Sequence, residues 1–467
     1  MADSFRRERD YLGEVEVPSE AYYGAHTARA IQNFKISGVR AHPLFIRFSG
    51  LVKWAAAVGN MKAGTLDRKI GEAICRAAEE VYDGSLMDQF VVDVFQAGAG
   101  TSHNMNTNEV IANRAIELLG GRKGDYSLVH PNDHVNMGQS TNDFFPTVIR
   151  VTALHLLTAL QDELARTISS LKALADRYDR VVKSGRTHLM DAAPIRYGQV
   201  FGGWARTLSK DGKRLDEASK GLLELNLGGS AVGTGVNAEP AYVDEAIRFL
   251  SEKTGFKFTT PESFVDVTHS MADMLWVASA LKALAVDISK ISSDLRLMNS
   301  GPATALGEVT LPAVQPGSSI MPGKVNPVIA ECMNMICFHV MGCERAIEEA
   351  AHAGQLELNV MMPLIAYDLN FSFEIMTNGL KMLREKLLDG LTVNAERSKK
   401  LLEASSGIAL ALNPYLGFDR TAELVREAMK RGVSVRELVK EERLMSEEEL
   451  DRVLDPYRIT KRGVVKA

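Results

Sequence analysis

Apolar residues recur at alternating steps of three and four positions along the segment from Met274 to Met298. This spacing is the pattern of a long helix with a coiled-coil-like seam. The positions are Met274, Val277, Leu281, Leu284, Ile288, Ile291, Leu295 and Met298. Such a stripe fits either the interior of one chain or a contact between subunits, and the pattern leaves both interpretations open.

Similar periodicities predict further helices on both sides of this segment. One runs from Val151 to Tyr178, and another from about Gly198 to Leu225, where glycines 202, 203, 212 and 221 weaken the pattern. Two more are expected from Pro327 to about Ala351 and from about Pro363 to Leu388. Together with the first segment, they predict a bundle of five long helices.

The regions on either side of the bundle contain shorter elements. An extended start around residues 14–23 precedes short helices, and glycines and prolines separate short amphipathic helices after Asn394. We therefore expect a mainly all-α subunit with three domains, covering residues 1–140, 141–393 and 394–467.

Composition narrows the class of protein. The chain has 467 residues, is 46% apolar and carries a formal charge of −5, without a long basic run among aromatic residues. It is therefore expected to bind neither nucleic acid nor a membrane as its main partner. Four cysteines without a paired C-x-x-C spacing argue against a zinc site and a disulfide framework. Because the N-terminus also lacks an apolar signal region, the expected location is cytoplasmic.

Four clusters of small polar side chains stand before or at the start of expected helices, at residues 98–109, 134–143, 185–191 and 317–327. The first turn of a helix leaves backbone N–H groups unpaired and favours an anion. Serine, threonine and asparagine also serve there as simple caps, so each cluster alone is ambiguous. Together they exceed what capping requires and predict an anion site. The glycines at 228–235 lack the context of a phosphate loop and are interpreted as a turn.

The last cluster reads Gly-Ser-Ser-Ile-Met-Pro-Gly-Lys-Val-Asn-Pro and combines two hydroxyls with a lysine. Its glycines and prolines predict a loop, and Asn326 with Pro327 predicts a helix start. Lys324 is a candidate anion partner, whereas Ser318 is a weak base or nucleophile unless nearby donors stabilise its alkoxide. No Gly-x-Ser-x-Gly elbow surrounds Ser318, which disfavours a hydrolase. His188 alone fits a structural role as well as a catalytic one.

These clusters together resemble the signature regions of the aspartase/fumarase superfamily, and the resemblance covers nearly the whole chain, including residues 354–360. It implies a three-domain, mostly α-helical subunit whose five-helix bundle assembles into a homotetramer. In this family, loops from three subunits form each active site. The resemblance also implies a small dicarboxylate substrate, with no cofactor and no metal ligands.

The resemblance further implies an elimination that produces fumarate. Removing a proton next to a carboxylate gives an aci-carboxylate, which needs donors around its oxygens. By resemblance, Ser318 is the catalytic base and His188 a second catalytic residue, which Glu331 orients. The implied contacts to the reacting carboxylate come from Thr101, Ser140, Thr141 and Ser319. Those to the other carboxylate come from Thr187, His188, Lys324 and Asn326, and Asn142 contacts the amino group.

Three segments are more similar to aspartases than to class II fumarases: Ser140 to Asp143 with its Thr141, residues 355–361, and Leu454 to Tyr457. They predict a carbon–nitrogen lyase that reversibly converts L-aspartate into fumarate and ammonia. The alternatives are a class II fumarase, a lyase for a substituted aspartate, or a catalytically silent scaffold like the lens proteins of the superfamily. The chain departs from the family pattern at Met190, Ala303, Cys343, Glu344 and Met362, which leaves the fine substrate preference open.

Overall fold

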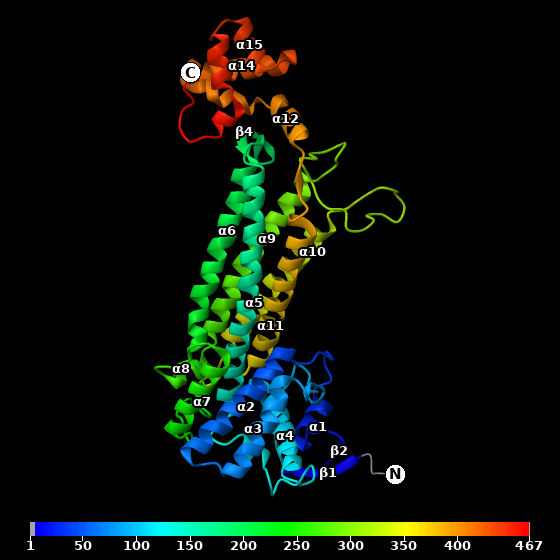
Figure 1. Ribbon diagram of the computed structural model, residues 1–467, viewed down its shortest axis with the longest axis vertical. Helices are drawn as coiled ribbons and strands as arrows, with labels where there is room; N and C mark the ends of the chain where they lie inside the picture. Colours follow the sequence, from blue (N-terminus) through cyan, green and yellow to red (C-terminus); the bar gives the residue numbers. More distant parts are fainter. Residues whose placement is uncertain (1–4, 467) are drawn as a thin grey trace. The chain divides into compact units, whose positions relative to one another are not determined.

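The computed structural model describes residues 5–466, which form mainly α-helices and three two-stranded antiparallel sheets (Figure 1). The predicted all-α class is confirmed. The chain divides into two compact units, each built from three stretches. The first contains the chain up to Gln161, Lys213–Ala285 and Phe338–Met376; the second contains Asp162–Gly212, Val286–Cys337 and the chain from Thr377 onward. The three domains expected from the sequence stay a prediction.

The first unit opens with a hairpin and a set of short helices. Their bounds are β1 Phe5–Asp10, β2 Gly13–Pro18, α1 Ala25–Asn33, α2 Pro43–Ala63, α3 Arg68–Asp83, η1 Met87–Gln89, η2 Gly98–Gly100, α4 Thr101–Leu118 and η3 Pro131–Val135. Capping residues determine where several of these helices begin and end. The Asp67 carboxylate accepts the N–H groups of Lys69 and Ile70 at the start of α3, and Gly84 ends this helix with a left-handed φ of 98°.

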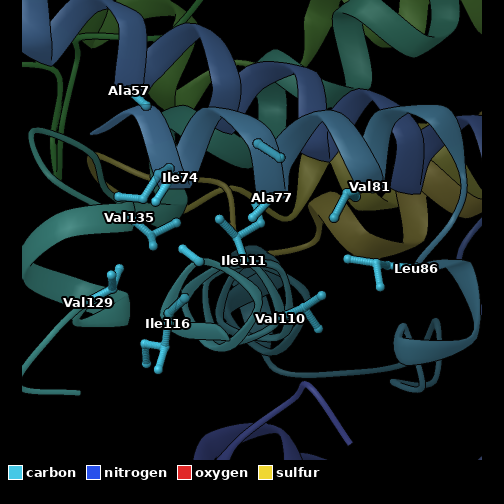
Figure 2. Packing of buried hydrophobic residues seen from close by; sticks show 14 of the residues in the cluster. Ala57, Ile74, Ala77, Val81, Leu86, Val110, Ile111, Ile116, Val129 and Val135 are labelled. Carbon is cyan, nitrogen blue, oxygen red and sulfur yellow. The ribbon is translucent and has the colours of Figure 1, made fainter. Parts of the chain in front are cut away.

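Helices α2, α3 and α4 share a core of small and branched apolar side chains, shown in Figure 2. Ile74 of α3 and Ile111 of α4 are both fully buried in it. Gly50 of α2 permits a close approach, because a Cβ there would lie 2.8 Å from both the Ala78 carbonyl and Val81. Close packing of this kind makes the core of these three helices rigid.

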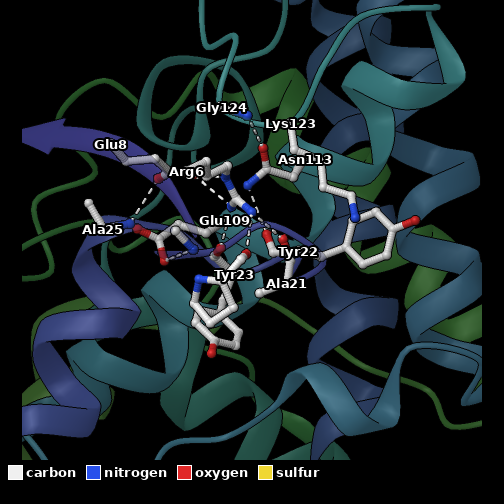
Figure 3. Close-up of polar contacts among 12 residues, drawn as sticks. Arg6, Glu8, Ala21, Tyr22, Tyr23, Ala25, Glu109, Asn113, Lys123 and Gly124 are labelled. Atoms are coloured by element: carbon white, nitrogen blue, oxygen red, sulfur yellow. Dashed lines mark hydrogen bonds and ion pairs between the residues drawn. The ribbon is translucent and has the colours of Figure 1, made fainter. Parts of the chain in front are cut away.

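The buried carboxylate of Glu109, in α4, binds the backbone of the N-terminal segment, and Glu8 of β1 binds the same segment (Figure 3). Glu109 accepts the N–H groups of Gly24 and His26, each at 2.8 Å, and the Thr27 hydroxyl at 2.6 Å. Burial raises the pKa of Glu109 to about 7 despite these donors. Glu8 accepts the Ala25 N–H at 2.9 Å. The polar residues at the start of α1 are therefore positioned by a helix some 80 residues away.

The five predicted long helices are present: α5 Thr141–Arg177, α6 Tyr197–Ala218, α9 Ala272–Met298, α10 Val328–His352 and α11 Met362–Leu383. Each contributes residues to both units. All eight positions of the Met274 to Met298 stripe are at most 8% exposed. The intramolecular interpretation is therefore confirmed for this stripe. Helix α6 tolerates its glycines because Phe201, Leu208 and Leu215 are fully buried.

The other elements link or follow these helices. They are β3 Val182–Thr187, β4 Met190–Arg196, η4 Ser219–Leu223, α7 Pro240–Thr254, α8 Phe264–His269, β5 Val309–Thr310, η5 Arg384–Leu388 and β6 Thr392–Val393. The C-terminal helices are α12 Ala395–Ala404, η6 Ser406–Leu412, α13 Asn413–Leu416, α14 Phe418–Arg431, α15 Val435–Glu441, α16 Glu447–Val453 and α17 Pro456–Ile459. They enclose a small core of their own around Leu424, Leu438 and Leu450.

One helix of the described chain, α5, is long and apolar enough to span a membrane by length and composition. In its most apolar window, 83% of the residues are buried inside the protein. This burial is what a core helix of a bundle shows.

Candidate active site

Thr101 is the first residue of α4 and follows a strained turn. Ala99 has a φ of 60° and Gly100 a φ of 88°, both left-handed. A side chain at Gly100 would collide with Phe145, since a Cβ there would lie 2.2 Å from the ring. The Ala99 N–H donates to the Val360 carbonyl at 2.8 Å. Two segments that the sequence singled out, 98–109 and 354–360, therefore meet at this turn.

Ser140, Thr141 and Asn142 form the start of α5, where capping and binding roles coincide. The Ser140 hydroxyl accepts the Asn142 N–H at 3.2 Å, and the Ser140 N–H donates to Asp143 at 2.8 Å. Asp143, at the third helical position, returns a bond to the Ser140 N–H as in a capping box, while the Ser140 hydroxyl accepts from the second helical position. The Asn142 amide donates to the Ala231 carbonyl at 2.7 Å.

Asp143 ties this turn to the glycine-rich segment. Its second carboxylate oxygen accepts the N–H groups of Gly228 at 3.1 Å and Ser230 at 3.0 Å. The glycine cluster is a turn, as predicted, and it binds this internal carboxylate. Complete burial raises the pKa of Asp143 to about 6, although the three N–H donors oppose that shift.

Lys53 lies fully buried beneath the same turn, and the sequence analysis missed it. Its ammonium donates to the side-chain oxygens of Asn136 and Gln139, each at 2.9 Å, and lies 4.0 Å from the centre of the Phe144 ring. Desolvation lowers the pKa of Lys53 well below its usual value. The Asn104 amide donates to both Asn136 and Thr141. A connected polar network therefore fixes the Thr141 hydroxyl in position.

Thr187 and His188 stand at the tip of the β3–β4 hairpin. Thr187 pairs with Met190, which leaves His188 and Leu189 as the two turn residues, with φ values of 57° and 62°. Two-residue hairpins with positive φ at both positions usually contain Asn-Gly, so a His-Leu turn stores strain of about 1–3 kcal/mol per residue. All four tip residues are exposed. Strain at an exposed histidine points to a functional requirement for this conformation.

The segment from Gly317 to Asn326 is an exposed loop closed at its base. The Gly317 N–H donates to the Lys324 carbonyl at 2.8 Å, and the Asn326 amide donates to the Gly317 carbonyl at 2.7 Å. The helix start predicted after Asn326 is confirmed, since α10 begins at Val328, and the amide N–H of Asn326 closes the loop before it. The Ser318 hydroxyl oxygen accepts the N–H groups of Ile320 at 3.2 Å and Met321 at 2.9 Å.

The remaining predicted residues belong to the same loop and the helix after it. Ser319 and Lys324 are exposed, and Lys324 forms no ion pair with any residue that the structure describes. Glu331 lies in the first turn of α10. Among residues 5–466, no hydrogen bond joins Glu331 to His188, so its orienting role stays a prediction.

The candidate residues fall into two groups. Thr101 and the Ser140–Asn142 turn belong to the first unit, while the hairpin tip, the loop and Glu331 belong to the second. Each group presents hydroxyls, amides or a cation at a helix start or a tight turn, which is chemistry for holding a multiply charged small anion. The fold is mainly helical, and the chemistry of each group fits a small anionic ligand.

Comparison with known proteins identifies the family. The Lyase family model matches residues 13–342, and the Fumarase C C-terminus model matches residues 408–461. The chain belongs to the aspartase/fumarase superfamily of lyases.

Individual relatives cover the whole chain. It is 47% identical to an aspartate ammonia-lyase of a Bacillus species over 99% of both chains. Among solved structures, a cobalt-bound fumarate lyase:delta crystallin of Brucella melitensis matches with a TM-score of 0.94 at 44% identity, covering 98% of this chain and all of that one. A class II fumarase of Schistosoma mansoni matches with a TM-score of 0.94 at 34% identity, covering 98% and 99% of the two chains.

Proposed function

We propose that this protein is a carbon–nitrogen lyase that reversibly converts L-aspartate into fumarate and ammonia. The observation that carries the chemistry is the Ser318 hydroxyl, which receives two backbone N–H groups in an exposed loop. The near-full-length identity to aspartate ammonia-lyases supports ammonia, rather than water, as the leaving group.

Ser318 is the proposed base. Its hydroxyl is weakly acidic, so its alkoxide needs stabilising donors, and the N–H groups of Ile320 and Met321 point at the correct atom. The alkoxide takes the proton from the carbon beside one carboxylate, and the electron pair moves into that carboxylate. When this aci-carboxylate collapses, its electrons form the carbon–carbon double bond of fumarate as the bond to nitrogen breaks.

The other predicted residues supply complementary charge. Thr101, Ser140, Thr141 and Ser319 are proposed to donate to the carboxylate on which charge develops. Thr187, His188, Lys324 and Asn326 are proposed to hold the other carboxylate, with Asn142 at the amino group. Closure of the 317–326 loop over the substrate then excludes water from the reaction.

We also propose a homotetramer with active sites shared between subunits. Besides its buried stripe, α9 exposes Trp276 by 53%, Val286 by 49% and Leu297 by 41%, at steps that keep these side chains on one side of a helix. Helix α10 exposes Met335 and Phe338 by 60% or more. Exposed apolar faces of this kind mark protein contacts. The four free cysteines support a reducing, cytoplasmic location.

Substrate assays test the proposed function directly. The purified protein is mixed separately with L-aspartate, L-malate and a methyl-substituted aspartate, and fumarate or its derivative is followed by ultraviolet absorbance. We expect strong activity with aspartate and release of one ammonia per fumarate. Strong activity with malate and none with aspartate would replace the proposal with a fumarase. Size-exclusion chromatography with light scattering tests the tetramer.

A further inference from the structure

Three charged groups, two of them buried, meet along strand β3 of the β3–β4 hairpin. Glu308 is fully buried, and its two carboxylate oxygens lie 2.8 Å from the Arg186 guanidinium and 3.1 Å from the Lys183 ammonium. Lys183 also donates to the Ser184 carbonyl at 2.9 Å. Both cations come from β3, the strand that ends at Thr187. A buried carboxylate is tolerated when it is paired this closely.

The backbone of Glu308 also forms hydrogen bonds, in addition to the ion pairs of its side chain. Its N–H donates to the Met298 carbonyl at 2.8 Å, and its carbonyl accepts the Asn394 N–H at 2.9 Å and the Tyr197 hydroxyl at 3.2 Å. The strand β5 starts at the next residue and pairs with β6. Glu308 is therefore a fixed point from which the chain leads to the loop containing Ser318.

The pairing of the β3–β4 hairpin is irregular close to its tip. A register shift between Ser184 and Arg186 interrupts the β3–β4 pairing, and a Cβ at Gly185 would lie 2.4 Å from the Ala193 carbonyl. A bulge of this kind redirects the side chain that follows it, here Arg186, which bonds to Glu308. The strained His188–Leu189 turn lies directly beyond. The Ser184 hydroxyl also donates to the Ser405 hydroxyl at 3.3 Å, but the bond from Arg186 to Glu308 lies directly next to the tip.

We propose that Glu308 is a positioning residue for the lyase reaction, holding the hairpin through Arg186 and Lys183 so that Thr187 and His188 face the substrate. This inference rests on the proposed function. The three charges sum to one positive charge close to the proposed carboxylate-binding residues, which also favours an anionic substrate.

The test compares two buried carboxylates of the same unit. Glu163 is 3% exposed and pairs with Arg384 at 2.6 Å, without contacting the hairpin. We therefore compare Glu308→Gln with Glu163→Gln, because each change removes the charge of a buried carboxylate that pairs with two cations. Both variants should unfold at lower temperature. Only Glu308→Gln should lower kcat/KM for aspartate, by about 100-fold, as expected for a misplaced binding group.

A double-mutant cycle distinguishes coupling between Glu308 and Arg186 from a general loss of stability. If Glu308 acts through Arg186, then Glu308→Gln combined with Arg186→Gln should lower kcat/KM no further than the stronger single variant. Additive losses would contradict the proposed coupling. If Glu308→Gln does not assemble, Arg186→Lys provides the test, because it keeps the charge but loses the planar fork, and kcat/KM should again fall.

The outcomes separate this inference from the proposed function. Normal kcat/KM in Glu308→Gln, or an equal loss in Glu163→Gln, overturns the positioning role while leaving the lyase intact. A wild-type protein active only on malate overturns the ammonia-lyase proposal, and the same variants are then measured with malate. A wild-type protein without activity on either substrate overturns both.

Discussion

The turn at residues 140–143 and the loop at residues 317–326 both present hydroxyl and amide groups, yet they are built in opposite ways. In the turn, the fully buried Asp143 accepts three N–H groups, and the fully buried Lys53 of α2 donates to two side-chain oxygens below it. In the loop, Ile320 is 84% exposed, and the shortest backbone bond, from Gly317 to Lys324 at 2.8 Å, closes the base. The turn is preorganised, whereas the loop has few buried contacts to resist opening. In the proposed reaction, the rigid turn would hold the substrate, and the loop would open to release the product.

The largest expected effect is on the loop. Ser318→Ala should lower turnover by roughly 10²–10⁴-fold, because it removes the proposed base without changing the backbone. Gln315→Ala, in the exposed segment just before the loop, is the matched control and should stay close to wild type. Initial rates of fumarate formation, with the oligomer checked by light scattering, measure the effect. Near-normal turnover would remove Ser318 from the role of base.

The next effect tests the rigidity of the turn. Lys53→Met leaves the partly buried Gln139 oxygen without its donor, at a cost of about 1–3 kcal/mol, and should also raise KM as Thr141 loses its support. Lys62→Met, an exposed position on the same helix, should change the free energy of unfolding by less than about 0.5 kcal/mol. Denaturant unfolding at one protein concentration compares them. Equal free energies of unfolding for the two variants would show that the hydrogen bonds of Lys53 do not stabilise the protein.

A smaller effect concerns the base of the loop. In Gly317→Ala, the new Cβ would lie 2.6 Å from the Asn326 nitrogen and 2.7 Å from the Lys324 carbonyl, so the loop must open. Overpacking of about 1–3 kcal/mol predicts roughly a 10-fold loss of kcat/KM. Gly342→Ala in α10 is the control, because its new Cβ meets nothing within 4 Å. If both variants keep full activity, closure at Gly317 does not matter.

The smallest effect is a pH dependence from Asp143. Its pKa rises from 3.8 to about 6 in the folded protein, so the folded state binds the proton more tightly than the unfolded state. Its contribution to stability is therefore greatest below about pH 4 and declines as pH rises to about 6. The Tm of the wild type, relative to Asp143→Asn, should fall across this interval and stay constant above it. A difference that rises with pH would show that the N–H donors outweigh burial.

The helices could be predicted because the pattern that indicates a helix lies within the residues of that helix. The stripe from Met274 to Met298 repeats with the helical period, and all of its positions are buried. The polar clusters were visible because helix starts require such residues. Lys53 stands among apolar residues as Leu-Val-Lys-Trp-Ala, and nothing nearby distinguishes it from a surface lysine. Its partners, Asn136 and Gln139, follow more than 80 residues later.

The sequence by itself determined the helical class, the presence of the 317–326 loop and, through resemblance, the family and its elimination chemistry. Only the tertiary structure decided which polar groups support those residues: Asp143 in the glycine turn, Lys53 beneath Thr141, and Glu308 between Arg186 and Lys183. The physical reason is that periodicity and capping depend on neighbours within a few turns. Whether a charge is buried and paired depends on distant segments that folding brings together.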